Sequence, residues 1–184
     1  MVELAVSLTV LLILTAIAVP SLVRSFRTYQ LNDAAGRLSD MLKYTRFEAV
    51  RRNTQVNFLM QASGGGWIVG VDANGNATID VGEKQELIAG FATLLGGGVA
   101  PAPNAIRAAL GGAALNTLPA SSTSVTFDAR GAIRSGGSVT ANIYVLYIGS
   151  VSNPEFGYRA VILLPSGSTQ IWTAQTGGPW QQIS

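Results

Sequence analysis

The chain has 184 residues, which is enough for one domain of ordinary size with an apolar core. It contains neither cysteine nor histidine, so disulfides, thiolate or imidazole metal sites and catalytic triads with a histidine base are excluded. The net charge of +2 is too small to indicate nucleic-acid binding by itself. Only 12% of the residues are charged, and a membrane anchor helps to explain so low a share.

The first stretch of the chain is apolar and uncharged from Leu4 to Val23. Twenty helical residues span about 30 Å, the thickness of the hydrocarbon core of a bilayer. Leucine and alanine favour helix, and the isolated hydroxyl side chains in this stretch can bond back to carbonyls of their own helix. The sequence therefore predicts a transmembrane helical segment over residues 1–23.

The helical pattern continues beyond this segment as an amphipathic stripe over residues 24–53. Its apolar positions recur at steps of three and four residues: Leu31, Ala34, Ala35, Leu38, Met41, Leu42, Thr45 and Ala49. Charged residues fall between these positions and would face outward. We expect one long helix with a membrane half and an amphipathic half.

Two residues of this helix need a particular environment. An ionised Glu3 at the edge of a lipid-embedded segment is costly unless it is paired or reaches the interface. Pro20 removes one helical hydrogen bond and crowds the carbonyl four residues earlier, which predicts a kink or a locally melted turn.

Residues 54–184 have the pattern of a strand-rich domain. Short apolar or alternating runs separated by turn residues predict strands at Gln55–Met60, Trp67–Val71, Glu86–Ala89, Ser124–Asp128, Val139–Ile148, Phe156–Leu164 and Thr169–Ala174. Val139–Ile148 is apolar on both faces at its centre and is expected to be a central strand, and the last two runs are expected to pair around the turn at residues 165–167. The sequence predicts an α+β fold, a long N-terminal spine helix packed on an antiparallel β-sheet.

Residues 90–122 differ from the rest of this domain in being rich in glycine, alanine and proline. Within them, Asn104 is placed to cap a short helix at Ala105–Leu110 that Gly111 would close. We interpret this segment as an insertion or long connection with one or two helical turns.

One stretch has the oxygen-donor spacing of a calcium loop. The side chains at its ligand positions are Asp72, Asn74, Asn76, Asp80 and Glu83. The glycine of the sharp turn is replaced by Ala77, and a strand rather than a helix is expected before the loop. Turns rich in aspartate and asparagine have the same sequence pattern, because these side chains hydrogen-bond to the backbone of the turn. We favour a hairpin turn and keep Ca²⁺ as the lesser hypothesis.

The sequence gives little support for catalysis. A serine–lysine pair through Lys43 or Lys84 would be the remaining base chemistry, but no spacing places either lysine beside a serine. Phosphate-binding and dinucleotide-binding glycine motifs are absent from the sequence. We predict a protein that is not an enzyme and requires no cofactor.

The N-terminal stretches resemble a known family. Val2-Glu3-Leu4, the apolar run, Ala16–Ser21 and the amphipathic continuation are similar to type IV pilins and type II secretion pseudopilins. The segment Tyr44–Asn53, with Arg46-Phe47-Glu48-Ala49-Val50-Arg51-Arg52, resembles the minor pseudopilins of the GspH/FimT group. The resemblance covers residues 1 to about 60 well and extends more loosely to residues 67–83, residues 127–131 and the C-terminal strands.

The resemblance implies a structural subunit of a filament that serves type II protein secretion or type IV pilus biogenesis. Glu3 would pair with the N-terminal amine of a neighbouring subunit during assembly. The implied partners are other pilin or pseudopilin subunits, the inner membrane, and a prepilin peptidase that processes the precursor before the new N-terminus is methylated. The family's basic leader and cleavage junction would precede Met1, and the sequence as it stands contains no peptidase site.

The implied location is the inner membrane, with a single span and the C-terminal domain in the periplasm. Residues 1–53 carry seven basic and four acidic side chains, and positive charge directly after a span ordinarily faces the cytoplasm. We follow the resemblance, because a basic leader would supply competing positive charge on the other side.

Two alternatives stay open. Some FimT-like proteins bind DNA for uptake, and Arg130, Arg134 and Arg159 are the candidate residues here. The arginine-rich motif of such proteins is replaced by Pro165–Gln170, which makes DNA the less favoured partner. The second alternative is a simple membrane-anchored binding domain.

Overall fold

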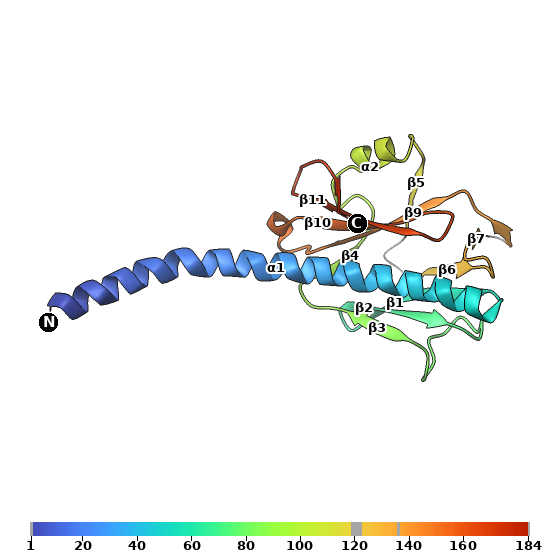
Figure 1. Cartoon of the computed structure of the whole chain (residues 1–184), viewed down its shortest axis with the longest axis horizontal. Helices are drawn as coiled ribbons and strands as arrows, with labels where there is room; N and C mark the ends of the chain where they lie inside the picture. Colours follow the sequence, from blue (N-terminus) through green and yellow to red (C-terminus); the bar gives the residue numbers. More distant parts are fainter. Residues whose placement is uncertain (1, 119–122, 136, 184) are drawn as a thin grey trace.

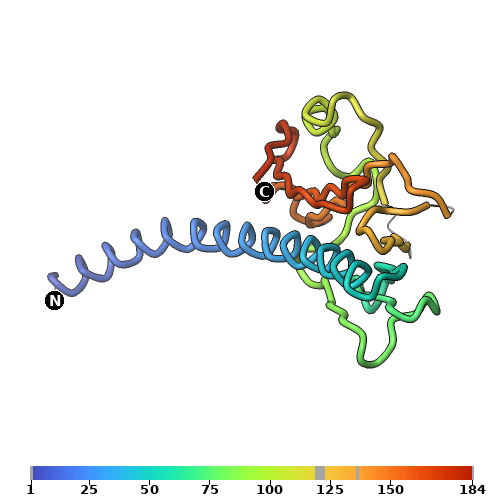
Figure 2. Tube along the Cα trace, turned by 45° about the vertical axis from the view of Figure 1, so that its right-hand side comes forward, coloured from blue at the N-terminus to red at the C-terminus, as the bar shows by residue number. Residues whose placement is uncertain are grey.

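The computed structural model describes residues 2–118, 123–135 and 137–183. The first element, α1 (Val2–Arg52), is one helix whose N-terminal half projects away from the domain, whereas its C-terminal half lies against the sheets (Figure 1). The helix is unbroken through Pro20, so no melted turn is present there. It bows gently over its N-terminal half (Figure 2).

The C-terminal half of α1 supplies one side of the main core. Every position of the predicted apolar stripe is buried, from Leu31 at its start to Ala49 near its end. Residues 24–30 are exposed or half-buried, so the packed part of the helix begins one to two turns later than the predicted amphipathic half. The prediction of a spine helix packed on sheet is confirmed.

The first sheet follows the helix directly. Its six strands are all antiparallel and lie in the order β3 (Gln85–Ile88), β2 (Gly66–Asp72), β1 (Val56–Ser63), β6 (Thr123–Phe127), β7 (Ile133–Ser135) and β8 (Ser138–Val139). In the β1–β2 hairpin, Ser63 pairs with Gly66 at the turn and Asn57 pairs with Asp72 at the far end.

The second sheet is formed mainly by the last third of the chain. Its strand order is β12 (Gln181–Gln182), β11 (Thr169–Ala174), β10 (Tyr158–Leu163), β9 (Ile143–Gly149) and β4 (Thr93–Leu95), and β5 (Leu115–Thr117) pairs with β9 in parallel. The 3₁₀ turn η1 (Pro154–Phe156) precedes β10. The central position of β9 and the β10–β11 pair agree with the prediction.

Residues 90–118 differ from their predicted form. They contain α2 (Asn104–Ala109), but also β4 and β5, which share one edge of β9: β4 pairs with residues 147–149 and β5 with residues 143–145. The segment is therefore part of the second sheet rather than a connection beside it. The end of the predicted insertion, residues 119–122, lies outside the described residues.

The predicted cap of α2 is wrong. Pro103 occupies the N-cap position, and no side chain caps the helix there. The expected closing glycine, Gly111, follows the helix with φ +68°, and its amide donates to the carbonyl of Ala108 at 3.3 Å. Ile106 on α2 is fully buried in a second apolar cluster on the other face of the second sheet.

Candidate functional site

The projecting half of α1 is a membrane-length apolar surface. Its most apolar 18-residue window has a mean hydropathy of 2.5 and none of that window is buried by the domain. The hydroxyls of Ser7 and Thr9 donate to carbonyls one turn earlier at 2.9 and 2.8 Å, as expected for polar side chains in lipid. Glu3 is exposed within this surface. By length and composition this half can cross a bilayer.

The C-terminal end of α1 carries a buried carboxylate held by two arginines. Glu48 is buried and accepts hydrogen bonds from Arg51 at 2.8 and 2.6 Å and from Arg52 at 2.5 Å. The hydrogen bonds from Arg51 lower the pKa of Glu48 to about 2, with a smaller contribution from Arg52. The Glu-Ala-Val-Arg-Arg part of the family pattern is thus an ion-pair cluster that closes the helix.

Arg46, one turn earlier, connects the helix to both sheets. Its Nε donates to the carbonyl oxygen of Gly131 at 3.2 Å, and its side chain runs across Gly167. Both glycines have positive φ and leave no space for a Cβ beside Arg46. Sequence reasoning missed this three-way contact, and the signal available was the arginine of the family pattern together with glycine in two turns.

Beside this contact lies an apolar groove. It is lined by Lys43, Arg46, Phe47, Val50, Gly167 and Ser168, with a volume of about 490 Å³. Phe47 is 63% exposed at its edge. The groove is open to solvent and offers an apolar contact surface on the domain.

The predicted calcium loop is organised by its own hydrogen bonds. The carboxylate of Asp72 accepts from the side-chain amide of Asn57 and from the backbone amides of Gly75, Asn76 and Ala77. These hydrogen bonds outweigh the effect of burial and lower the pKa of Asp72.

The other acids of the loop are used in the same way. Asp80 accepts from the side chains of Asn74, Asn76 and Thr78, and Glu83 accepts from the backbone amides of Ala73 and Asp80. Within the described residues, no group of three acidic, histidine or cysteine side chains is placed to hold a metal ion. The loop is built as an Asx-rich turn, and binding of Ca²⁺ there stays the lesser hypothesis.

Of the three candidate DNA contacts, the structure brings two together. Arg130 and Arg134 line one open groove of about 870 Å³ at the far end of the domain, next to Asn53, Thr54 and Gln55. Arg134 donates from one terminal nitrogen to the carbonyl of Gly137, and its Nε is buried without a partner among the described residues.

Arg159, the third candidate, is not a surface residue. It is 4% exposed, and its Nε donates to the side-chain oxygen of Asn32 at 2.6 Å. A second bond runs to the carbonyl of Tyr158 at 2.9 Å. Burial lowers the pKa of Arg159. Its assignment as a DNA contact is therefore wrong, because it joins β10 to α1 from inside the domain.

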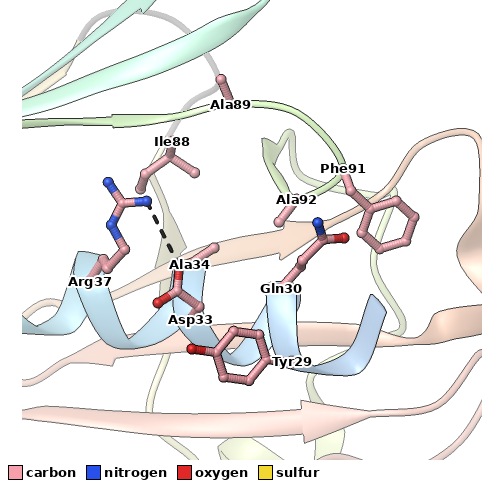
Figure 3. A pocket seen from close by; sticks show the side chains of 9 residues that line it. All are labelled: Tyr29, Gln30, Asp33, Ala34, Arg37, Ile88, Ala89, Phe91 and Ala92. Carbon is pink, nitrogen blue, oxygen red and sulfur yellow. Dashed lines mark ion pairs between the residues drawn. The ribbon is translucent and has the colours of Figure 1, made fainter. Parts of the chain in front are cut away.

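A further pocket lies where α1 enters the domain, between the helix and residues 88–92 (Figure 3). Arg37 is paired with Asp33 at 3.8 Å, the contact drawn in Figure 3, and with Glu86 at 2.6 Å. The pocket has a volume of about 170 Å³, below the roughly 300–1,000 Å³ of small-molecule sites.

These features define a class: a subunit with one membrane-length helix, half exposed and half packed as the spine of a two-sheet domain. A family model described as type II transport protein GspH matches residues 34–167, and the chain belongs to this family. The resemblance to minor pseudopilins is thereby confirmed, and the family and fold are those of structural pilin-type subunits.

Solved structures to which the chain is similar include two crystal forms of the type IV minor pilin FimU of Pseudomonas aeruginosa (strain PAO1). The first is 18% identical over 77% of this chain and 91% of that chain, with a TM-score of 0.48. The second is 15% identical over 85% of this chain and 90% of that chain, with a TM-score of 0.39. No curated protein matches the chain.

Proposed function

We propose that this minor pseudopilin is held in the inner membrane by the projecting half of α1 and then passes into a filament through that same half. The observation that carries the proposal is that a membrane-length apolar helix, with none of its most apolar window buried, continues without a break into the spine of a folded domain. Such a surface needs lipid or other apolar helices around it.

Glu3 is proposed to be the polar contact of assembly. Helix association in lipid depends on close packing and on polar partners, and an unpaired carboxylate in an apolar environment is costly. The N-terminal amine of a neighbouring subunit would neutralise Glu3 as the helices pack. The family membership supports this role.

The remaining parts of the proposal concern location and processing. The family supports a periplasmic C-terminal domain, a precursor processed by a prepilin peptidase, and other pilin-type subunits as partners. Filaments of type II secretion and of type IV pili are both compatible with this chain.

Substitution of Glu3 tests the proposal. In cells that make the other subunits, Glu3→Gln should leave the chain in the membrane fraction but strongly reduce its crosslinking to those subunits and its recovery in sheared filaments. The matched control is Ser7→Ala, one turn further along the same exposed surface, which should behave as the parent chain. Normal incorporation of Glu3→Gln would remove Glu3 from the mechanism.

DNA binding is a second candidate, favoured by the groove that holds Arg130 and Arg134. Neither arginine forms an ion pair with an acid within the described part of the chain, although Asp128 also lines the groove. Arg130 is exposed and can approach phosphates, whereas Arg134 is half-buried and partly bonded to Gly137. If the groove binds DNA, the double variant Arg130→Gln with Arg134→Gln should weaken binding and flatten its dependence on salt. Exposed Arg107 on α2 supplies the control, Arg107→Gln, which should not. Equal binding of DNA by the parent chain, the double variant and Arg107→Gln would exclude this candidate, and so would the absence of DNA binding by the parent chain.

A further inference from the structure

We propose that, before assembly, the end of the domain nearest the membrane rests on the lipid headgroups, where Arg24 and Arg27 bind the phosphate groups of anionic lipids. This end is formed by Arg24, Phe26, Arg27 and Tyr29 of α1 and by the loops that carry Phe91 and Val151, which together we call the basal surface. The inference rests on the proposed membrane anchoring and adds to it a position for the domain.

The helical part of the basal surface has the composition of a membrane interface. Phe26 is 59% exposed and Tyr29 is 68% exposed, immediately after the uncharged stretch. Aromatic side chains concentrate at the headgroup level of bilayers, and arginines next to a span are attracted to anionic lipid. Exposed aromatic residues interleaved with two arginines therefore fit a layer of lipid headgroups.

The loops of the basal surface are held at the same height as these residues. The guanidinium of Arg27 lies 4.4 Å from the centre of the Phe91 ring, and Phe91 packs edge-on against Phe156 at 5.5 Å. Figures 1 and 2 show both loops at the side of the domain from which the N-terminal half of α1 projects. Val151, at the start of the loop before η1, is 69% exposed.

The distance along the helix brings this end to the bilayer surface. Arg27 lies four residues beyond Val23, which is about 6 Å along a helix axis. The headgroup layer on each side of the hydrocarbon core is about 5–8 Å thick. If the uncharged stretch fills the hydrocarbon core, Phe91 and Val151 lie in or directly on the headgroups.

The charges of the basal surface favour anionic lipid. Arg27 has a neutral partner, with its terminal nitrogen 3.0 Å from the side-chain oxygen of Gln30, and Arg24 is exposed. The opposing charge is Glu155, which accepts a hydrogen bond from Asn153. Asp33 lies further along α1, away from the membrane segment, and is paired with Arg37. Two arginines against one exposed acid leave a net attraction to phosphate, which also gives a role to the positive charge after the span.

The absence of cysteine from the sequence allows a direct test with the full chain. Single cysteines placed by Leu11→Cys, Val151→Cys and Phe47→Cys would carry a nitroxide in vesicles of phosphatidylethanolamine with phosphatidylglycerol. Electron paramagnetic resonance then measures access of a water-soluble nickel chelate and of oxygen to each label. Phe47 is the control, because it is exposed on α1 about 30 Å further from the membrane than Arg27.

We expect the label at residue 151 to be severalfold less accessible to the nickel chelate than the label at residue 47. This protection should be reduced in vesicles of phosphatidylcholine alone and in the double variant Arg24→Gln with Arg27→Gln, but not in Arg107→Gln. Equal access at residues 151 and 47, with residue 11 accessible to oxygen and protected from nickel, would overturn the proposal while leaving the anchor intact. Nickel access at residue 11 would overturn the anchoring as well.

Discussion

Arg46 donates a hydrogen bond from Nε to the carbonyl oxygen of Gly131 at 3.2 Å, and this bond ties the end of α1 to the turn between β6 and β7. The same side chain packs across Gly167 in the turn between β10 and β11. The turn between β10 and β11 also bonds to the start of β7, because the amide of Ile133 donates to the carbonyl of Pro165 at 3.0 Å. One arginine thus connects the spine helix to both sheets.

This contact predicts a large effect for Gly167→Ala. Gly167 has φ +79°, and a Cβ there would collide with the carbonyl oxygen of Gly131 and with Arg46. We expect the free energy of unfolding to fall by about 2–4 kcal/mol, from backbone strain and the displaced contact together. The control is Gly112→Ala, where φ is also +79° but the space is open, so only about 1 kcal/mol should be lost. Equal losses in urea denaturation of the two variants would contradict the contact.

The ion-pair cluster at Glu48 predicts a pH dependence of stability. The pKa of Glu48 is lowered from 4.5 to about 2, so its contribution is complete above pH 4.5 and is lost as the pH falls toward 2. Glu48→Gln should lower the free energy of unfolding at neutral pH by about 1 kcal/mol, a modest value because Arg51 and Arg52 are half exposed to water.

Chemical denaturation of the full chain in detergent, at neutral pH and at pH values between 4.5 and about 2, checks the prediction. The difference in the free energy of unfolding between the parent chain and Glu48→Gln should shrink as the pH falls toward 2. A difference that stays constant from neutral pH to about pH 2 would show that Glu48 is not ionised in the cluster.

Because Arg159 is buried, we expect its position to accept an apolar side chain of similar length. Arg159→Met removes a buried charge and keeps most of the packed stem, so we expect a free energy of unfolding within about 1 kcal/mol of the parent. Arg159→Ala should lose about 2 kcal/mol or more, because the stem is removed as well. A loss above about 3 kcal/mol for the methionine variant, measured by urea denaturation, would mean that the hydrogen bond to Asn32 dominates.

Because the loop at residues 72–83 is organised by its own hydrogen bonds, we expect it to be stable without calcium. Because the carboxylate of Asp72 accepts four hydrogen bonds, Asp72→Ala should lower the free energy of unfolding by about 2–3 kcal/mol. Addition of Ca²⁺ to the parent chain should leave its thermal midpoint unchanged. An increase with Ca²⁺ that disappears in Glu83→Gln would support the calcium hypothesis instead.

The helix and the main strands could be predicted because their signals are local. Leu31 to Ala49 follow the helical repeat without interruption, and each predicted position is buried. β9 was recognisable because residues 143–148 are apolar on both faces, which fits its place inside the second sheet.

The parts that could not be predicted depend on distant contacts. β4 and β5 are three residues each in glycine- and alanine-rich surroundings, and they are strands because β9 offers them an edge. Asn104 does not cap α2 because the helix begins directly after Pro103. The burial of Arg159 depends on α1 lying over β10, which no pattern around residue 159 reveals.

The measurement that tests the filament proposal most directly is co-purification of the chain from native membranes, with mass spectrometry of its partners and of its own N-terminus. We predict other pilin-type subunits among the partners and an N-terminus that has been processed and methylated. Recovery of an unprocessed N-terminus with no pilin-type partner would contradict assembly and leave a membrane-anchored binding domain.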